Sequence, residues 1–332
     1  MTMLHLRSHW IFFAACVVCS GARAQFPYDS ATPISEPKLF AEGVISTPDD
    51  EFGGQFSADG RTFWFSKSVP RFQLDTIFVS TFHDGRWAKP QIAPFSGQWH
   101  DYDPVLSADG QRLYFISDRP RADGKPHAHY DIWYLEHGAR GWSAPKNLGA
   151  PVNGEWSSHF ATTTRNGSLY FTSDRPGSKG YLDVWRARAV DGHFAEPENL
   201  GVAINDEKWA NFEVYVDPDE RYMIVSAYGH EDGHGDCDLY ISYRRDGVWH
   251  PLRNLGPKVN SAARDYNARV TPDGRYLFFT SERGLPTERR DAPWTYREFT
   301  TAIRSVRNGL GNIYQIDLSV VLDAELREDA SK

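Results

Sequence analysis

A turn of the Ser-x-Asp-Gly type recurs five times in this chain, and each copy leads directly into a segment of apolar and aromatic residues. Asp-Gly and Asn-Gly pairs favour tight hairpin turns because they tolerate positive φ. A repeat with a period of about fifty residues is typical of propellers and related arrays, and it therefore constrains the fold before any local motif does. The five turns occupy residues 57–60, 107–110, 164–167, 217–220 and 271–274.

Each repeat contains further strand signals in a constant order. A second strand follows the turn, a third opens with Asp or Asn, and a fourth combines an aromatic residue, Pro and Asn-Leu-Gly, most clearly at 142–149 and 249–256. Alternating apolar and aromatic residues between turn signals favour strands. We expect second strands at 62–66, 113–117, 169–173, 222–226 and 277–281, and third strands at 75–78, 131–133, 183–185, 238–240 and 312–314.

The two ends of the chain complete one another. The last repeat, ending at 314–318, has no fourth strand after it, while Glu36-Pro37-Lys38-Leu39-Phe40 has that pattern and no repeat before it. Such closure would join the ends of a ring and remove exposed strand edges. We therefore predict an all-β propeller of five four-stranded blades, closed by the N-terminal strand.

The runs Pro104–Gly110, Leu113–Pro120 and Asp131–Trp133 resemble the PD40 (WD40-like) repeat of TolB-like propellers, and the resemblance covers nearly all residues after 24. It implies a periplasmic or secreted propeller, often one that contacts other proteins. TolB-type propellers usually have six blades, so a six-bladed ring is the alternative. The α/β domain that precedes the propeller in TolB has no counterpart here, so a function in the Tol system is not implied.

The N-terminus has the pattern of an export signal. Residues 1–7 are basic, 10–19 are apolar, and Ala22 and Ala24 are small residues at the positions that a signal peptidase reads. We predict a signal peptide over 1–24, cleaved after Ala24, and one propeller domain over 25–332 in a periplasmic or secreted protein. Lipidation of Cys16 or Cys19 is the alternative. The apolar stretch is too short to span a bilayer, which needs about 20 residues.

Composition narrows the partners. The formal net charge is −8 with scattered Lys and Arg, which makes nucleic acid and anionic membrane poor partners. After removal of the signal only Cys237 remains, so no internal disulfide can form. No phosphate-binding loop or nucleophile elbow is present. We expect a monomeric, non-catalytic binding or scaffold protein of the cell envelope, with a protein or glycan partner.

Repetition separates scaffold from candidate site residues. The Asp of Asp118-Arg119 and Asp174-Arg175, and the Asp that opens most third strands, recur from blade to blade, so we interpret them as fold devices. The first strands differ more. Their aligned columns are Glu51, Asp101, Ser158, Asn211, Asp265; then Phe52, Tyr102, His159, Phe212, Tyr266; then Gly53, Asp103, Phe160, Glu213, Asn267.

Strand side chains alternate between faces, so the first and third columns should share one channel mouth and the aromatic column should be core. The mouth would then hold Asp101, Asn211, Asp265, Asn267 and Arg269, with His159 in the neighbouring column. Three interpretations compete. They are a hydrated polar channel, a divalent-cation site such as calcium, and a carbohydrate hydrolase or lyase using Glu51, Asp103 and Glu213.

Two loops depart from the repeat. Residues 230–237 contain His230, His234 and Asp236, which are candidate metal ligands if they converge with His127 and His129; a solvated loop is the alternative. Residues 284–311 insert a segment in which Trp294, Phe299, Ile303 and Val306 fall near helical spacing. We predict a short amphipathic helix packed over one face, with Trp294, Tyr296 and Arg297 as lid or binding residues, or alternatively a plug at the closing seam.

Overall fold

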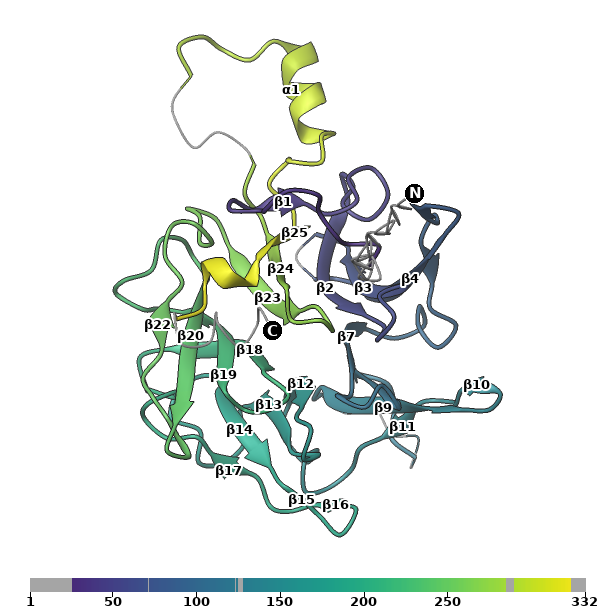
Figure 1. Ribbon diagram of the computed structural model, residues 1–332, viewed down its shortest axis with the longest axis vertical. Helices are drawn as coiled ribbons and strands as arrows, with labels where there is room; N and C mark the ends of the chain where they lie inside the picture. The colour runs from purple at the N-terminus through teal and green to yellow at the C-terminus, as the bar shows by residue number, and fades with distance from the viewer. Residues whose placement is uncertain (1–25, 71, 123, 125–127, 285–289, 324–332) are drawn as a thin grey trace, which may run out of the picture.

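The computed structural model describes residues 26–70, 72–122, 124, 128–284 and 290–323. Five antiparallel sheets surround one central axis, and their first strands lie nearest to it (Figure 1). The protein is therefore an all-β, five-bladed propeller. The alternative of six blades is wrong, because each of the five repeats forms one sheet and the chain ends complete the fifth.

Strand positions follow the repeats closely. Blade 1 contains β2 (Asp50–Phe56), β3 (Thr62–Ser68), β4 (Asp75–His83), β5 (Arg86–Trp87) and β6 (Gln91–Ile92). Blade 2 contains β7 (Asp101–Leu106), β8 (Arg112–Ser117), β9 (Asp131–Gly138), β10 (Gly141–Trp142) and β11 (Lys146–Asn147). Blade 3 contains β12 (Ser158–Thr163), β13 (Leu169–Ser173), β14 (Asp183–Ala187) and β17 (Glu198–Asn199), with a small hairpin of β15 (Ala189–Val190) and β16 (His193–Phe194).

Blade 4 contains β18 (Ala210–Val216), β19 (Tyr222–Tyr228), β20 (Asp238–Arg245), β21 (Val248–Trp249) and β22 (Arg253–Asn254). Blade 5 contains β23 (Asp265–Val270), β24 (Tyr276–Ser281), β25 (Asn312–Asp317) and β1 (Lys38–Leu39), followed by the 3-10 turn η1 (Leu318–Val320). The predicted second and third strands are confirmed, and every third strand begins at the expected Asp or Asn.

The ring closes as predicted, by a strand from each end of the chain. β1 pairs antiparallel with β25, with Lys38 opposite Gln315 and Leu39 opposite Tyr314. The next residue, Phe40, is 5% exposed and carries this seam into the core. Its ring centroid lies 5.0 Å from that of Phe278 in blade 5 and 5.3 Å from that of Phe63 in blade 1. The N-terminal strand thus joins two blades that are more than 200 residues apart.

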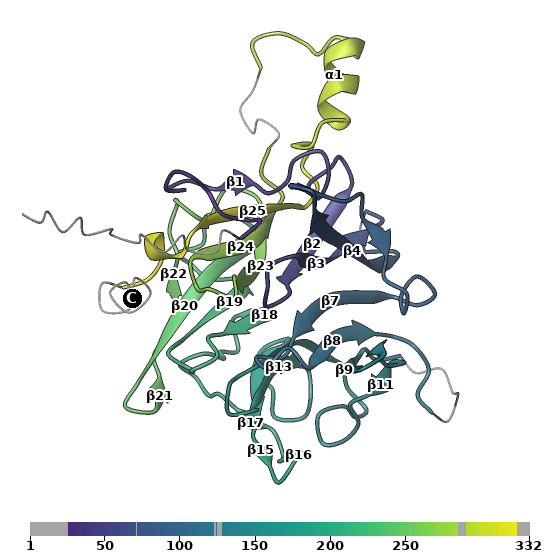
Figure 2. The same cartoon turned by 45° about the vertical axis from the view of Figure 1, so that its right-hand side comes forward.

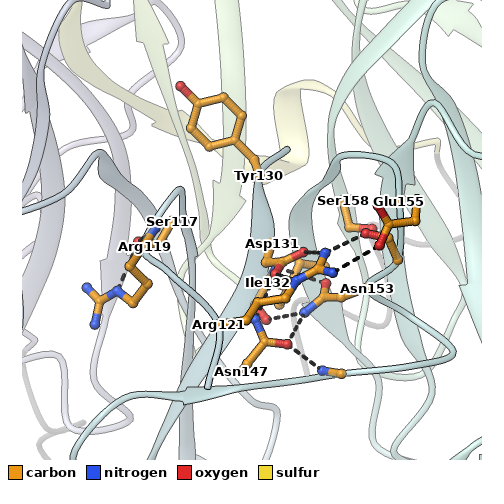
Figure 3. Close-up of polar contacts among 12 residues, drawn as sticks. Ser117, Arg119, Arg121, Tyr130, Asp131, Ile132, Asn147, Asn153, Glu155 and Ser158 are labelled. Atoms are coloured by element: carbon orange, nitrogen blue, oxygen red, sulfur yellow. Dashed lines mark hydrogen bonds and ion pairs between the residues drawn. The ribbon is translucent and has the colours of Figure 1, made fainter. Parts of the chain in front are cut away.

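The recurring Asp residues are scaffold, as expected. In blade 2 the carboxylate of Asp131 accepts hydrogen bonds from Asn147 Nδ2 at 2.8 Å and Arg121 Nε at 2.7 Å (Figure 3). Asn147 Oδ1 in turn accepts from the amide of Asn153 at 3.0 Å. The equivalent amide-to-carboxylate bonds are Asn199 to Asp183 at 2.7 Å and Asn254 to Asp238 at 3.0 Å. Repeated, partly buried networks of this kind hold the outer strand in place, as a scaffold role requires.

The insertion forms a helix that is not buried against the propeller, whereas Val306, just after the helix, packs against the core of blades 4 and 5. Helix α1 (Tyr296–Ile303) has a capping box between Thr295 and Glu298, and none of its residues is buried. It stands beyond the rim of blade 5 in both views (Figures 1 and 2). The prediction of a helix is confirmed, whereas its packing over one face of the ring is not. Among the described residues no helix is long and apolar enough to cross a membrane.

The seam provides a first prediction. We expect Phe40→Ala to lower the free energy of unfolding by about 3–5 kcal/mol, because the cavity it leaves faces aromatic rings of two blades that cannot collapse into it. Urea unfolding followed by tryptophan fluorescence measures this. Lys38→Ala, an exposed change in the same strand, should alter the value by no more than about 0.5 kcal/mol. Equal effects of the two variants would contradict the proposed role of the seam.

Candidate functional site

Each of the five first strands contains a β-bulge in the same region. The pairing register shifts between Phe52 and Gln55 and at the equivalent positions of β7, β12 and β23, and one residue earlier in β18. The residue inside the bulge has positive φ in four blades: Gly53, Asp103, Phe160 and Asn267. A bulge adds one residue to a strand and breaks the two-residue alternation of its side chains. The columns before and after it therefore do not share one face.

The first column does not line the channel, which corrects the expectation for Glu51, Asp101, Asn211 and Asp265. All four are at most 1% exposed and bind the segments that join neighbouring blades. Asp101 accepts from Arg119 at 2.6 Å and Asp265 accepts from Arg283 at 2.6 Å, which is the role of the recurring Asp-Arg and Glu-Arg pairs. Glu51 pairs with Lys67 at 2.9 Å, and Asn211 donates to Ile204 O at 2.9 Å.

The third column meets at the axis and forms what we call the polar plug: Gly53, Asp103, Glu213, Asn267 and Arg269 from four blades. Arg269 Nη2 lies 3.0 and 2.9 Å from the two carboxylate oxygens of Asp103, and Asn267 Nδ2 lies 2.9 Å from Asp103 Oδ1. A Cβ on Gly53 would lie 3.0 Å from that same oxygen. The predicted convergence of Asp103, Asn267 and Arg269 is therefore observed, but their charges neutralise one another in a closed centre.

Glu213 is the one carboxylate of the plug without an ion pair among the described residues. It is 7% exposed, and its Oε2 has no hydrogen-bond partner. Burial raises the pKa of Glu213 to about 7, and the negative charge of Asp103 adds to this effect, while Ser226 and Arg264 partly offset it. Asn267 Oδ1, Arg269 Nε and the Tyr266 hydroxyl are also buried without partners. Polar atoms in this number are the usual lining of an internal water site.

The aromatic column forms one mouth of the channel and is only partly core. Phe52 and Tyr266 are buried, whereas Tyr102, His159 and Phe212 are partly exposed. Tyr102 shares a hydrogen bond of 3.0 Å with His159 Nδ1, and burial lowers the pKa of His159 to about 4, so the imidazole is neutral near pH 7. His159 thus lies at a channel mouth, as expected, but among rings and not among carboxylates.

Loop residues extend this column into a continuous chain of contacts that we call the aromatic ring. Tyr130 lies 5.6 Å from Tyr102, Phe72 lies 5.6 Å from Phe52, and Tyr228 lies 4.8 Å from Phe212, centroid to centroid. Tyr181, 73% exposed, stacks on Phe212 at 6.3 Å. The complete ring comprises Phe52, Phe72, Tyr102, Tyr130, His159, Tyr181, Phe212, Tyr228 and Arg264.

Arg264 is the charged member of the aromatic ring. Its guanidinium lies 5.7 Å from the ring centroids of both Phe72 and Tyr228, and its Nε donates to the Tyr228 hydroxyl at 2.9 Å. Glu282 pairs with it at 3.0 Å, yet the Arg264 side chain stays 25% exposed. All five blades therefore contribute to one surface of aromatic faces with a partly accessible cation.

The opposite mouth holds a cavity of about 550 Å³. It lies at the other ends of the same first strands, beside the Ser-x-Asp-Gly turns, and its lining includes Leu106, Thr163, Tyr215 and Val270. Arg165 and Arg221 also line it, but each forms a short ion pair with a neighbouring carboxylate, Asp219 and Asp217 respectively. The polar plug thus separates this cavity from the aromatic ring.

The candidate metal ligands do not assemble. His230 is stacked between Trp209 at 3.8 Å and Tyr240 at 4.1 Å, and the backbone of His234 donates to Asp238, while Asp236 is exposed. Over the described ranges no group of three or more His, Cys, Asp or Glu side chains could hold a metal. His127 lies outside the described residues. The proposed calcium site at the channel mouth is likewise not formed by the plug, because Arg269 occupies the Asp103 carboxylate.

The aromatic ring was missed by the sequence analysis, which assigned the second column to the core and the helix residues Trp294, Tyr296 and Arg297 to a lid. All three belong to the insertion, and helix α1, which contains Tyr296 and Arg297, stands away from the channel (Figure 2). A usable signal did exist. An aromatic residue lies one to three positions before the third-strand Asp in blades 1, 2 and 3, namely Phe72, Tyr130 and Tyr181. In Figure 3 the Tyr130 side chain points away from the scaffold network around Asp131.

Comparisons with known proteins identify no family for this chain. No family model matches the chain, and no curated protein matches its sequence. Among solved structures, TolB from Acinetobacter baumannii superposes with a TM-score of 0.46 at 12% identity, over 81% of this chain and 54% of that one. An α-L-arabinofuranosidase from Lactobacillus brevis gives 0.46 at 13%, over 84% and 94%. The GH62 α-L-arabinofuranosidase domain of Coprinopsis cinerea gives 0.44 at 13%, over 86% and 95%.

The polar plug predicts a pH dependence. Glu213 binds its proton more tightly in the folded protein, where its pKa is about 7, than in the unfolded chain, where its pKa has the ordinary glutamate value of 4.5. Its ionisation therefore destabilises the fold progressively as pH rises from about 4.5 through 7, by about 3 kcal/mol in total. We expect Glu213→Gln to match the wild type near pH 4.5 and to be more stable by up to that amount at pH 8, in urea unfolding at both pH values.

The comparison isolates Glu213 because the two proteins share every other titrating group. Burial also raises the pKa of Glu51 to about 7, but that contribution is present in both and cancels. Parallel stability profiles of the wild type and the Gln variant from pH 4.5 to 8 would show that Glu213 is not buried as a proton-binding carboxyl.

Proposed function

We propose that this is an exported, non-catalytic binding protein of the cell envelope that holds a glycan on the aromatic ring. The observation that carries the proposal is the convergence of partly exposed aromatic side chains from several blades, including Tyr181, Phe212 and Tyr228, around the partly exposed Arg264. Binding sites for small ligands are typically aromatic surfaces with few polar groups that fix orientation. Sugar rings present flat C–H faces to aromatic rings and hydroxyls to hydrogen-bonding groups at the rim.

The positive charge of Arg264 limits the classes of ligand that could bind the aromatic ring. Arg264 already lies against Phe72, Tyr228 and Tyr266, so a second cation at these faces would meet like charge. Nucleic acid is disfavoured by the net charge of −8, because phosphate binding depends on clustered Lys and Arg. A neutral or carboxylate-bearing glycan satisfies both constraints, with Arg264 as the donor to hydroxyl or carboxylate oxygens.

The geometry gives the alternative, a carbohydrate hydrolase or lyase, little support. Glycoside hydrolysis needs two carboxyl groups that flank an accessible bond. Of the three candidates, Glu51 and Asp103 have side chains that are 0% exposed and paired with Lys67 and Arg269. Glu213 lies beneath the aromatic ring and is 7% exposed. A binding role requires only the exposed side chains of the aromatic ring and needs none of these three carboxylates.

Tyr181→Ala tests the proposal. We expect it to weaken binding of the best-bound member of a panel of neutral and uronic-acid oligosaccharides at least about tenfold, because a central exposed aromatic side chain contributes more than about 1 kcal/mol to many interfaces. Isothermal titration calorimetry with the wild-type protein selects the oligosaccharide and then measures the variant. Phe212→Ala, from the same stacked pair, should act in the same direction.

Tyr296→Ala is the matched control, since Tyr296 is 87% exposed but lies on helix α1 away from the ring. The Tyr296→Ala variant should bind the selected oligosaccharide with the affinity of the wild type. No binding across the panel, or equal losses in the Tyr181 and Tyr296 variants, would overturn the proposal. Release of new reducing ends from a bound oligosaccharide would favour the hydrolase instead.

A further inference from the structure

Residues 294–303 present an apolar surface that the propeller does not cover, although Val306 just beyond them packs against the core. Trp294 is 40% exposed, Tyr296 87%, Phe299 49% and Ile303 46%, and no residue of helix α1 is buried. Trp294 and Phe299 pack edge to face at 6.0 Å, so their side chains form one cluster. These are large aromatic side chains at the most protruding element of the molecule (Figure 1).

The helix is stabilised locally and not by tertiary packing. Thr295 accepts from the amide of Glu298 at 3.2 Å, and the Glu298 carboxylate accepts from the amide of Thr295 at 2.9 Å. The Arg290 guanidinium lies 3.7 Å from the Trp294 ring centroid and pairs with Glu298 at 3.5 Å. An eight-residue helix is marginal in water even with good caps, so its apolar face needs a second surface to be stable.

The charge of this segment is opposite to that of the chain. Residues 290–307 contain four arginines and two carboxylates, a net charge of +2, in a chain with a net charge of −8. Arg297, Arg304 and Arg307 are exposed and form no ion pair with any residue of the described ranges. Arginine on one side of a helix with Trp, Tyr and Phe exposed is the pattern of interfacial membrane helices.

A second copy of the chain fits this surface less well. A second copy would need an apolar groove to receive the helix. Val202 and Val248, which are exposed, line a groove of about 410 Å³ between blades 3 and 4. Arg186 and Arg244 line the same groove against a single carboxylate, Glu198. The groove therefore offers no acidic surface to a basic helix. A lipid surface with anionic headgroups offers both an apolar boundary and the required charge.

We propose that residues 290–307 attach the protein peripherally to an anionic lipid surface, with Trp294, Tyr296 and Phe299 at the headgroup boundary and Arg297 and Arg304 against lipid phosphates. The protruding position of α1 keeps the acidic propeller at a distance from the anionic surface. The whole-chain charge made an anionic membrane a poor partner in the sequence analysis; the local reversal of charge at one protrusion changes that expectation. This site is separate from the aromatic ring.

Vesicle flotation tests the attachment. The protein beginning at Gln25, which retains every strand of the propeller, is mixed with vesicles of phosphatidylcholine and phosphatidylglycerol in equal parts, or of phosphatidylcholine alone. We expect binding to the anionic vesicles that weakens with added salt. The double variant Arg297→Glu with Arg304→Glu should bind at least roughly tenfold more weakly. Trp294→Ser with Phe299→Ser should lose binding by a similar factor.

Two control variants make the same kinds of substitution at exposed sites outside the helix segment. Arg86→Glu with Arg140→Glu makes the same change in net charge at exposed sites on blades 1 and 2, and Val202→Ser with Val248→Ser removes exposed apolar side chains from blades 3 and 4. Neither control should alter vesicle binding. Because no residue of α1 is buried, the helix variants should keep the wild-type unfolding curve, and so should the controls, whose changes are all at exposed sites. Absence of binding to anionic vesicles, or equal losses in helix and control variants, would overturn the proposal. So would a dimer in sedimentation that only the helix variants dissociate.

Discussion

The pairing of β1 with β25 is the interaction on which the rest of the structure depends. Two short hydrogen-bonded strands, Lys38–Leu39 and the middle of β25, convert a row of repeats into a ring. Because the ring is closed, every first strand packs between the first strands of two neighbouring blades. Closure also gives the molecule a single axis, which is what allows side chains from blades 2, 4 and 5 to meet in the polar plug.

The bulge in each first strand determines which side chains reach that axis. With simple alternation, Glu51 and Asp101 would have shared a face with Gly53 and Asp103. The extra residue in each strand instead turns the first column toward the junctions between blades, where Arg119 and Arg283 bind Asp101 and Asp265. The acidic residues expected to crowd the mouth are thereby divided among separate sites, where all of them except Glu213 form ion pairs. A charged cluster in the sequence has become a set of structural ion pairs.

Much of the fold could be predicted from the sequence, because each determinant is local and repeated five times. Turn residues, the Asp that opens a third strand and the apolar second strand each specify a conformation within a few residues, and the missing fourth strand identified the closure by simple counting. The site depends on other information. Whether Tyr102 is core or surface is decided by a register shift and by loops such as the one carrying Phe72, and neither has a signature in the strand pattern. The helix at 296–303 could be predicted because its determinants, a capping box and apolar spacing, are local. Its separation from the propeller could not be predicted from them.

The polar plug separates the two mouths of the channel because its buried ion pair cannot be opened without a large energetic cost. Arg269 and Asp103 are both desolvated, and such a pair offsets the cost of burial only when each charge keeps its partner. A ligand that entered the plug would have to break this pair or displace Asn267, and would leave a buried charge uncompensated. We therefore expect the proposed ligand at the aromatic ring and not in the plug. For the same reason we expect binding and not catalysis at this axis, because its ionisable side chains, Asp103, Glu213 and Arg269, are buried.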